Sequence, residues 1–310
     1  MARRSITSLV LLPALVLGLA ASSSTPARAS FGGVGDMYVT GDISNTVRAY
    51  AGVTGSYLGL FTVTSNNPLG IHFGPFNGRV LVGGFGGGVF EYDATTGAYI
   101  KTYGPPAWAW SAVYAPNGNV LVASSATDQI LEYDSATGAF IQLFAPLPGA
   151  PADMRYGPNG NLYVCAFAGG MVWELDPVSG NVISSWSLPP FAQPNDVAFL
   201  NGEILVTAMQ TNLVYRFDST PVHNLLGSFT GTNWGNPHGI AISPHNGNIY
   251  VVDGVTAQVH MFDPITFAEL NPFVLSPGPG DKVVDIEFRQ DLRPTPSIPT
   301  TWGRLKTLYR

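Results

Sequence analysis

Three aspartates in equivalent places have the clearest potential for chemistry in this chain. Asp153, Asp196 and Asp285 each open a short apolar segment, and these segments read DMRYGP, DVAFL and DIEF. Asn195 precedes Asp196, and His238 stands at the matching place before a fourth segment, GIAISP. Carboxylate and amide oxygens are the usual ligands of calcium. Asp153, Asn195, Asp196 and Asp285 could therefore hold a divalent cation such as Ca²⁺.

Each of these residues also has a simpler interpretation. An aspartate that opens a strand can serve only as a hydrogen-bond acceptor for an adjacent loop. His238 could be a general base near neutral pH or an ordinary loop residue. Trp110 occupies the corresponding place of a further segment, with Trp108 nearby, so that an aromatic surface could grip a sugar or a peptide. The candidate ligand-binding residues are Trp110, Asp153, Asn195, Asp196, His238 and Asp285.

These segments belong to a repeat that runs along most of the chain. One strand-like segment of each unit ends in an aspartate, and the intervals between those aspartates are 41, 42, 42 and 45 residues: Asp93, Asp134, Asp176, Asp218 and Asp263. Each unit contains four short segments that alternate apolar and polar residues, with Asn-Gly pairs at the turns, as antiparallel strands do. A period of this length built from four strands is typical of a β-propeller blade.

The order of the segments predicts how the ring closes. Six copies of each strand are present, but the first unit lacks its innermost strand, and an unmatched copy occurs at residues 285–288. We therefore predict an all-β, six-bladed β-propeller of four-stranded antiparallel blades, in which residues 285–288 complete the first blade. The aspartates would then surround the mouth of a central channel. Arg155 is expected to pair with Glu287 across that channel, and His72 with a neighbouring carboxylate.

The run PHGIAISPHNGNIYVVD, followed by VHMFD, resembles NHL repeats and the wider group of gluconolactonase-like and streptogramin-lyase-like six-bladed propellers. The resemblance covers residues 36–288 and implies the fold, whereas that scaffold hosts hydrolases, lyases and binding proteins. It implies a catalytic role for His238, which lies in a stretch similar to one that carries a catalytic histidine in the lyase group. It also implies metal binding by Asn195, although Asp196 stands where the gluconolactonase-like group has glycine.

Charge and terminal segments set the cellular context. Residues 1–29 have a basic start, an apolar run and an Ala-Arg-Ala site, which predict a cleaved signal peptide and a secreted protein. Residues 30–291 would form the propeller, and residues 292–310 a Pro/Thr-rich spacer with a short basic amphipathic tail. Residues 30–288 carry 19 acidic and 6 basic residues, which disfavours nucleic acid as a partner. The lone cysteine, Cys165, is expected to be a buried small hydrophobe.

The repeat is regular and contains no complete catalytic set, which favours a secreted, monomeric, non-catalytic propeller that binds a small molecule, a carbohydrate or a protein at its mouth. The first alternative is a metal-dependent lactone hydrolase or lyase that uses Asp153, Asn195, Asp196 and His238. The second is a cell-surface structural module held by its C-terminal tail. No transmembrane segment is expected in the mature chain.

Overall fold

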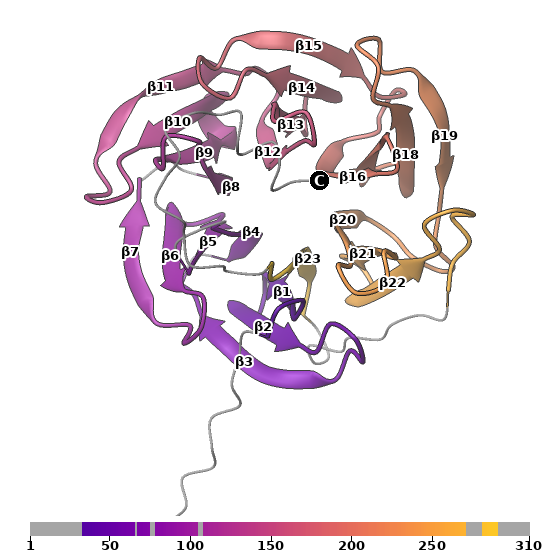
Figure 1. The fold of residues 1–310 in the computed structure, drawn as a ribbon, viewed down its shortest axis with the longest axis horizontal. Coiled ribbons are helices and arrows are strands. Elements are labelled where there is room, and N and C mark those ends of the chain that lie inside the picture. The colour runs from indigo at the N-terminus through magenta and orange to yellow at the C-terminus, as the bar shows by residue number, and fades with distance from the viewer. Residues whose placement is uncertain (1–32, 66, 75–77, 105–107, 271–280, 291–310) are drawn as a thin grey trace, which may run out of the picture.

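The computed structural model describes residues 33–65, 67–74, 78–104, 108–270 and 281–290 of the chain. Within these ranges the regular elements are 23 strands and one 3₁₀ turn, η1 (Ser125–Thr127). The strands form antiparallel sheets that stand side by side around a central axis (Figure 1). No helix in this part of the chain is long and apolar enough to cross a bilayer. The predicted signal segment and tail lie outside the described residues.

One sheet joins the two ends of the described chain. Its strands, in order across the sheet, are β23 (Val283–Phe288), β1 (Met37–Gly41), β2 (Thr46–Tyr50) and β3 (Tyr57–Val63). Met37 pairs with Phe288, and beyond the strand ends Gly35 N–H donates to Arg289 O at 2.7 Å. The predicted pairing of the C-terminal strand with the first strand is therefore confirmed.

The next two four-stranded units form one eight-stranded sheet. They are β4 (Pro68–Phe73), β5 (Arg79–Gly84), β6 (Val89–Asp93) and β7 (Tyr99–Tyr103), then β8 (Ala109–Tyr114), β9 (Val120–Ser124), β10 (Gln129–Tyr133) and β11 (Phe140–Pro146). The residue pair Gly84 and Ala109 links the two units.

Three further sheets complete the circle. They contain β12 (Pro151–Tyr156), β13 (Leu162–Ala166), β14 (Met171–Leu175) and β15 (Val182–Ser187); β16 (Pro194–Leu200), β17 (Glu203–Ala208), β18 (Leu213–Asp218) and β19 (Leu225–Phe229); and β20 (Pro237–Ile242), β21 (Ile249–Asp253) and β22 (Gln258–Phe262). The outer strand predicted for the last unit, at residues 269–275, lies largely outside the described residues.

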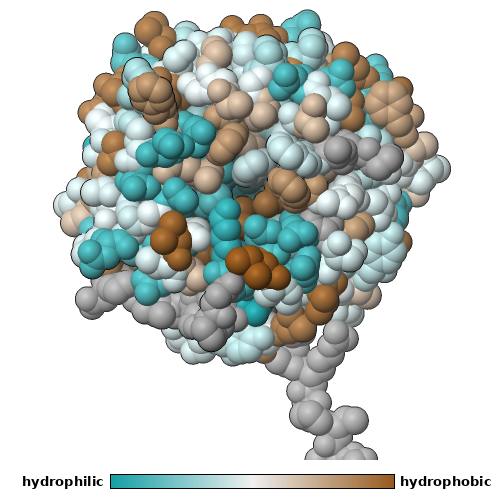
Figure 2. Space-filling model, turned by 180° about the vertical axis from the view of Figure 1, so that it is seen from behind, coloured by the Kyte–Doolittle hydropathy of each residue, from teal (hydrophilic) through white to brown (hydrophobic). Residues whose placement is uncertain are grey.

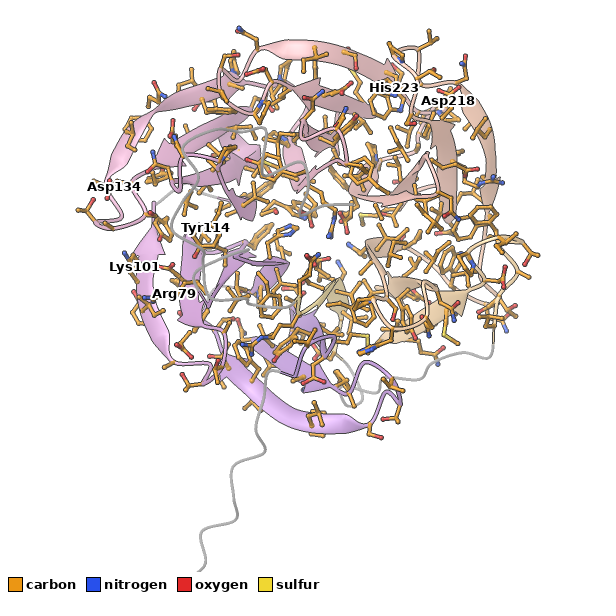
Figure 3. All side chains as sticks on the ribbon, viewed as in Figure 1. Arg79, Lys101, Tyr114, Asp134, Asp218 and His223 are labelled. Atoms are coloured by element: carbon orange, nitrogen blue, oxygen red, sulfur yellow. The ribbon has the colours of Figure 1, made fainter. Side chains whose placement is uncertain are left out.

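Hydrophobic side chains fill the space between neighbouring sheets (Figure 3). Tyr38 of β1 packs edge-on against Phe61 of its own sheet and Phe73 of the next, with ring centroids 5.0 and 4.8 Å apart. The second strand of each unit is almost wholly buried, because both of its faces meet another sheet. Cys165 of β13 is fully buried among such residues, as predicted.

Glutamates on the third strand of a unit hold the turn between its first two strands. Glu132 Oε1 accepts hydrogen bonds from the side-chain amides of Asn117 and Asn119, at 2.8 and 2.7 Å. Glu174 does the same for Asn159 and Asn161. The Asn-Gly turns that the sequence predicts are therefore fixed by side chains as well as by backbone conformation.

The innermost strands contact one another in a closed ring, in the order β23, β4, β8, β12, β16, β20 and back to β23. Each of these strands begins two residues before the start that the sequence pattern predicts. Near its start lies a register irregularity, at which two residues of the inner strand stand opposite one residue of the partner strand. Such a β-bulge breaks the period-two pattern and redirects side chains. The bulge positions are those of the candidate residues.

Candidate functional site

The three candidate aspartates sit at the bulges of β12, β16 and β23, and all are buried. A bulge removes ladder partners from backbone N–H groups, so that other acceptors must replace them. In each case the aspartate Oδ1 accepts the N–H of the next residue, at 2.6–2.7 Å: Asp153 from Met154, Asp196 from Val197 and Asp285 from Ile286.

Two of these carboxylates also bond to the neighbouring sheet. Asp196 Oδ2 accepts the N–H of Ile240 at 2.8 Å, and Asp285 Oδ2 accepts that of Ile71 at 2.7 Å. On its other side, β23 approaches β20 so closely that position 239 requires glycine, because a Cβ there would lie 2.3 Å from Asp285 Oδ1. Asp196 and Asp285 therefore hold adjacent sheets together, which is the structural role that the sequence left open.

Threonine hydroxyls add to these contacts, and sequence reasoning missed them. Thr207 Oγ1 accepts the N–H of Asp196 at 3.0 Å and donates to the backbone carbonyl of His238 at 2.5 Å. Thr40 accepts the N–H of Asp285 in the same way, at 2.9 Å. Threonine is common in strands, so that a single threonine there indicates no special role. The only signal of these contacts in the sequence is that a threonine recurs on the strand next to one that begins with an aspartate.

Charged side chains from four inner strands form what we call the axial cluster: His72, Asp153, Arg155, Asp196, Asp285 and Glu287. Arg155 lies 2.8 Å from Glu287 and 3.6 Å from Asp196. His72 Nε2 lies 2.6 Å from Asp153 Oδ1, which also accepts from Ser111 Oγ at 2.6 Å. Both predicted pairings, of Arg155 with Glu287 and of His72 with a carboxylate, are therefore confirmed.

The cluster carries more negative than positive groups, and its pKa values respond to this imbalance. Burial, and then the charge of Asp153, raise the pKa of Asp196 to about 7. Burial and both neighbouring aspartates raise the pKa of Asp285 well above its usual range. Burial opposes ionisation of Asp153 too, but His72 and Arg155 outweigh it, so that the pKa of Asp153 is lowered. Burial would lower the pKa of His72, but the charge and hydrogen bond of Asp153 outweigh it, so that the pKa of His72 is raised.

His238 and Asn195 lie apart from these charges. The His238 side chain is 1% exposed, and neither of its ring nitrogens has a hydrogen-bond partner in the described structure. Gly254 lies against the ring, where a Cβ would be 2.5 Å from Cδ2. Burial, and then the charge of Lys282, lower the pKa of His238 to about 3. Asn195 is also buried, and its amide points at Met209 Sδ, 3.2 Å away.

Aromatic side chains gather at the starts of the inner strands and on the turns between the second and third strands of the units. Phe85 and Trp108 stack with ring centroids 4.7 Å apart and are 48% and 44% exposed. Trp110 packs against Phe167 at 5.5 Å. Trp108 has a φ of 55°, and its carbonyl accepts a hydrogen bond from Ser125 N–H. The residues directly before β4, β12, β16 and β20 have the same left-handed backbone, so that this conformation belongs to the repeat.

A pocket of about 320 Å³ lies beside Phe167, between the β13–β14 turn and the β15–β16 loop. Its lining has no charged side chain: Phe167, Ala168, Gly169, Gly170, Ser187, Leu188, Pro189, Pro190, Phe191, Ala192 and Gln193. Phe191 is 84% exposed and has a φ of 65°, the second aromatic residue held in left-handed backbone on these loops. Sequence reasoning missed Phe191, although an aromatic residue directly after two prolines was an available signal.

Seen from the side opposite to that of Figure 1, hydrophilic residues gather near the middle of the molecule, around a hollow (Figure 2).

Comparison with known proteins identifies the fold. No family model matches the sequence, and no curated protein matches it. A protein of unknown function from Bacteroides caccae superposes with a TM-score of 0.64 at 17% identity, over 81% of this chain and 97% of that one. A streptogramin B lyase structure gives 0.57 at 19% identity, over 76% and 79%. A chain of the nidogen/laminin complex gives 0.67 at 13% identity, over 83% and 99%.

At these identities the likeness concerns the fold, and it agrees with the ring of antiparallel sheets in Figure 1. The chain is a β-propeller, similar in architecture to streptogramin B lyase.

Proposed function

We propose that this chain is a secreted, non-catalytic, six-bladed propeller that binds an uncharged ligand at the mouth formed by its aromatic loops. Its six blades would be the first sheet, the two halves of the eight-stranded sheet and the three remaining sheets. Residues 1–29 would be removed on export, residues 30–291 would form the propeller, and residues 292–310 would be a tail that can hold the protein at the cell surface.

The observation that carries this proposal is the exposure of two large aromatic side chains, Trp108 and Phe191, on the aromatic loops. Leaving two large rings in solvent forgoes the free energy of burying them, on the order of 2 kcal/mol each. This exposure is accounted for if the rings are covered by a ligand when the protein acts.

The chemistry of these loops selects an uncharged ligand with apolar faces. The pocket beside Phe191 has no charged side chain, and the polar side chains in its lining are Ser187 and Gln193. A sugar offers flat C–H faces for the stacked pair Phe85 and Trp108, and hydroxyls for the polar side chains of the pocket. We therefore propose a neutral oligosaccharide as the ligand class.

The lyase alternative depends on His238, and the geometry disfavours it. A general base must accept a proton near the working pH and must reach the substrate. His238 is buried, and its pKa of about 3 keeps the ring neutral and weakly basic at neutral pH. Of the aspartates that would assist it, Asp196 accepts a backbone N–H from the neighbouring sheet, and Asp153 is bonded to His72 and Ser111.

The test is binding to a panel of neutral oligosaccharides, followed by tryptophan fluorescence and by calorimetry. We expect a member of the panel to bind, and Trp108→Ala to weaken its affinity at least about tenfold, as for an aromatic anchor in an interface. Phe140→Ala, which removes a 58% exposed aromatic side chain from the outer strand β11, is the matched control and should change nothing.

Two outcomes would overturn the proposal. One is the absence of binding to any neutral oligosaccharide, or equal binding by the Trp108→Ala protein. The other is turnover of a lactone or a similar ester by the wild-type protein that Asp196→Ala abolishes, which would make the chain an enzyme.

A further inference from the structure

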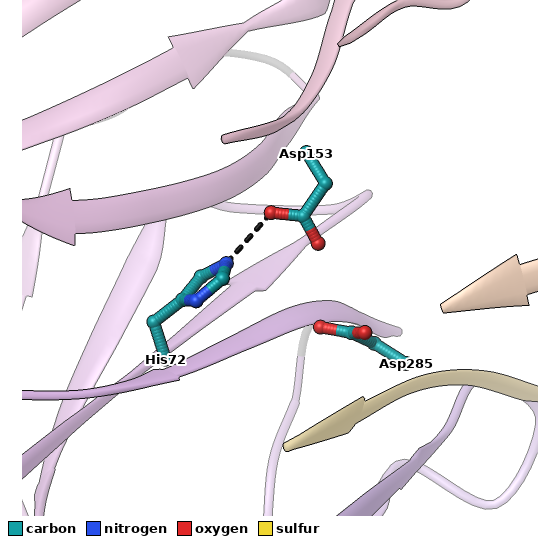
Figure 4. A group of neighbouring side chains, drawn as sticks. All are labelled: His72, Asp153 and Asp285. Carbon is teal, nitrogen blue, oxygen red and sulfur yellow. Dashed lines mark hydrogen bonds and ion pairs between the residues drawn. The ribbon is translucent and has the colours of Figure 1, made fainter. Parts of the chain in front are cut away.

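Three side chains of the axial cluster offer a compact set of metal-ligand atoms. His72 of β4, Asp153 of β12 and Asp285 of β23 each present one such atom, and the three atoms lie within 4.8 Å of one another (Figure 4). All three residues are buried, with exposed fractions of 7%, 2% and 2%. The strands that carry them are far apart in sequence, so that this convergence exists only in the closed ring.

The formal charges at this place are unbalanced. Asp153, Asp196, Asp285 and Glu287 face two basic side chains, and Arg155 is already committed to Glu287 and Asp196. Even with His72 protonated, the cluster retains an excess of two negative groups. Burying charge without compensation is costly, so that such a cluster takes up protons or a cation. A metal-bound His72 is neutral, which makes the excess three, and one divalent cation would balance two of these charges.

The carboxylates are already oriented, as the ligands of a metal site must be. Asp153 is fixed by Ser111 Oγ and Met154 N–H, and Asp285 by the N–H groups of Ile71 and Ile286. These hydrogen bonds hold each carboxylate while leaving lone pairs for a metal. Such supporting contacts orient ligands and tune affinity in known metal sites. The hydrogen bond from His72 to Asp153 is the one that a metal would replace.

We propose that His72, Asp153 and Asp285 bind a divalent transition-metal ion on the axis of the propeller. One imidazole and two carboxylates suit Mn²⁺, Fe²⁺ or Zn²⁺. Calcium prefers six to eight oxygen ligands, which this set does not provide. The site differs from the calcium set predicted from sequence, because it includes His72 and excludes both Asp196 and Asn195, whose amide points at Met209. It does not depend on the oligosaccharide proposal.

The experiment is calorimetric titration of the metal-free protein with Mn²⁺ and Zn²⁺ at pH 7.5, with Ca²⁺ in parallel. We expect one Mn²⁺ or Zn²⁺ per chain, with Ca²⁺ at least about tenfold weaker. His72→Ala should weaken the transition-metal affinity at least about tenfold, in the range that even supporting contacts show. His245→Ala, which removes an exposed histidine from a surface turn, is the matched control and should bind as the wild type does.

A second variant distinguishes the loss of a metal ligand from a failure to fold. Asp285→Asn keeps an oxygen acceptor for Ile71 N–H but removes a ligand charge, so that it should fold, as near-ultraviolet circular dichroism would show, and lose affinity as His72→Ala does. The proposal fails if the wild type takes up neither metal, if both axial variants bind normally, if His245→Ala abolishes uptake, or if Ca²⁺ binds more tightly than Mn²⁺ and Zn²⁺.

Discussion

Asp196 has a structural role, but its buried position beside Asp153 disfavours the ionised form of its carboxyl group. Its two oxygens accept N–H groups from its own strand and from β20. Burial and the charge of Asp153 raise its pKa to about 7, so that a neutral acceptor would serve these bonds with less repulsion. At this position, therefore, hydrogen-bond geometry and electrostatics favour different side chains.

We predict that Asp196→Ala destabilises the protein by about 2–4 kcal/mol, because two buried N–H groups lose their acceptor. Asp196→Asn should cost less than half of that, since its amide oxygen can still accept a hydrogen bond and the repulsion from Asp153 disappears. Urea unfolding of both variants measures the difference. Equal losses for the two variants would show that the charge, and not the hydrogen bonds, matters.

Sequence reasoning at this scale found residue types better than their geometry. It placed Asp153, Asp196 and Asp285 at equivalent strand starts, which was sufficient to expect them near the axis. It could not foresee that a bulge would turn them toward backbone N–H groups, because the alternation that it used begins at these aspartates, where the bulges lie. It also treated His238 as a member of the mouth, whereas Gly254 covers its ring.

At the scale of elements, the third strand of a unit anchors the rest of that unit. Glu174 of β14 accepts hydrogen bonds from Asn159, Asn161 and Tyr163, and from Ser184 of β15. Glu91 of β6 works between units, because it accepts from Tyr103 of β7 and from Tyr114 of β8, which Figure 3 labels. A turn and two strands thus depend on a single carboxylate.

We predict that Glu174→Ala lowers the free energy of unfolding by about 2–3 kcal/mol at pH 7, because several buried donors lose one acceptor. Burial alone would raise the pKa of Glu174, but hydrogen bonds from Ser184 and Asn161 outweigh it and lower the pKa to about 2. A lowered pKa stabilises the folded state above the unfolded value of 4.5, and this contribution disappears as the pH falls toward 2.

The measurement is urea unfolding of wild type and Glu174→Ala at pH 7 and pH 3. The difference between them should shrink at pH 3. Glu203→Ala is the control, because Glu203 forms a more exposed ion pair with Arg216 and should cost less than about 1 kcal/mol. A Glu174 effect that stays constant between the two pH values would contradict the hydrogen-bond explanation.

At the scale of the whole molecule, the sequence predicted the closure of the ring for a physical reason. Residues 285–288 form an inner strand that has no unit of its own, and the first unit lacks an inner strand. If this strand joins the first unit in one sheet, neither is left with an unpaired edge, which would be costly. The register of Met37 with Phe288 confirms this. The pocket beside Phe191 could not be foreseen, because it arises between a turn of one unit and the loop that connects this unit to the next, and the repeat does not specify their conformations.

We predict that a chain ending at Lys282, which lacks β23, does not form a stable monomer. It would expose the buried edge of β1 and lose the apolar side chains of Val283, Ile286 and Phe288 from one inter-sheet cluster. A chain ending at Gln290 is the control and should melt as the full chain does. Size-exclusion chromatography and thermal melting compare the two; a monomeric, cooperatively melting chain without β23 would contradict the prediction.

The same seam has a mechanical consequence. Met37 at the start of β1 lies opposite Phe288 at the end of β23, so that both exits of the propeller leave from one end of a single ladder. A pulling force applied through the two ends would open that ladder one rung at a time, and would not load all of its hydrogen bonds together as shear does. A propeller tethered through both termini would therefore yield first at its seam, at low force, while the sheets between stay intact.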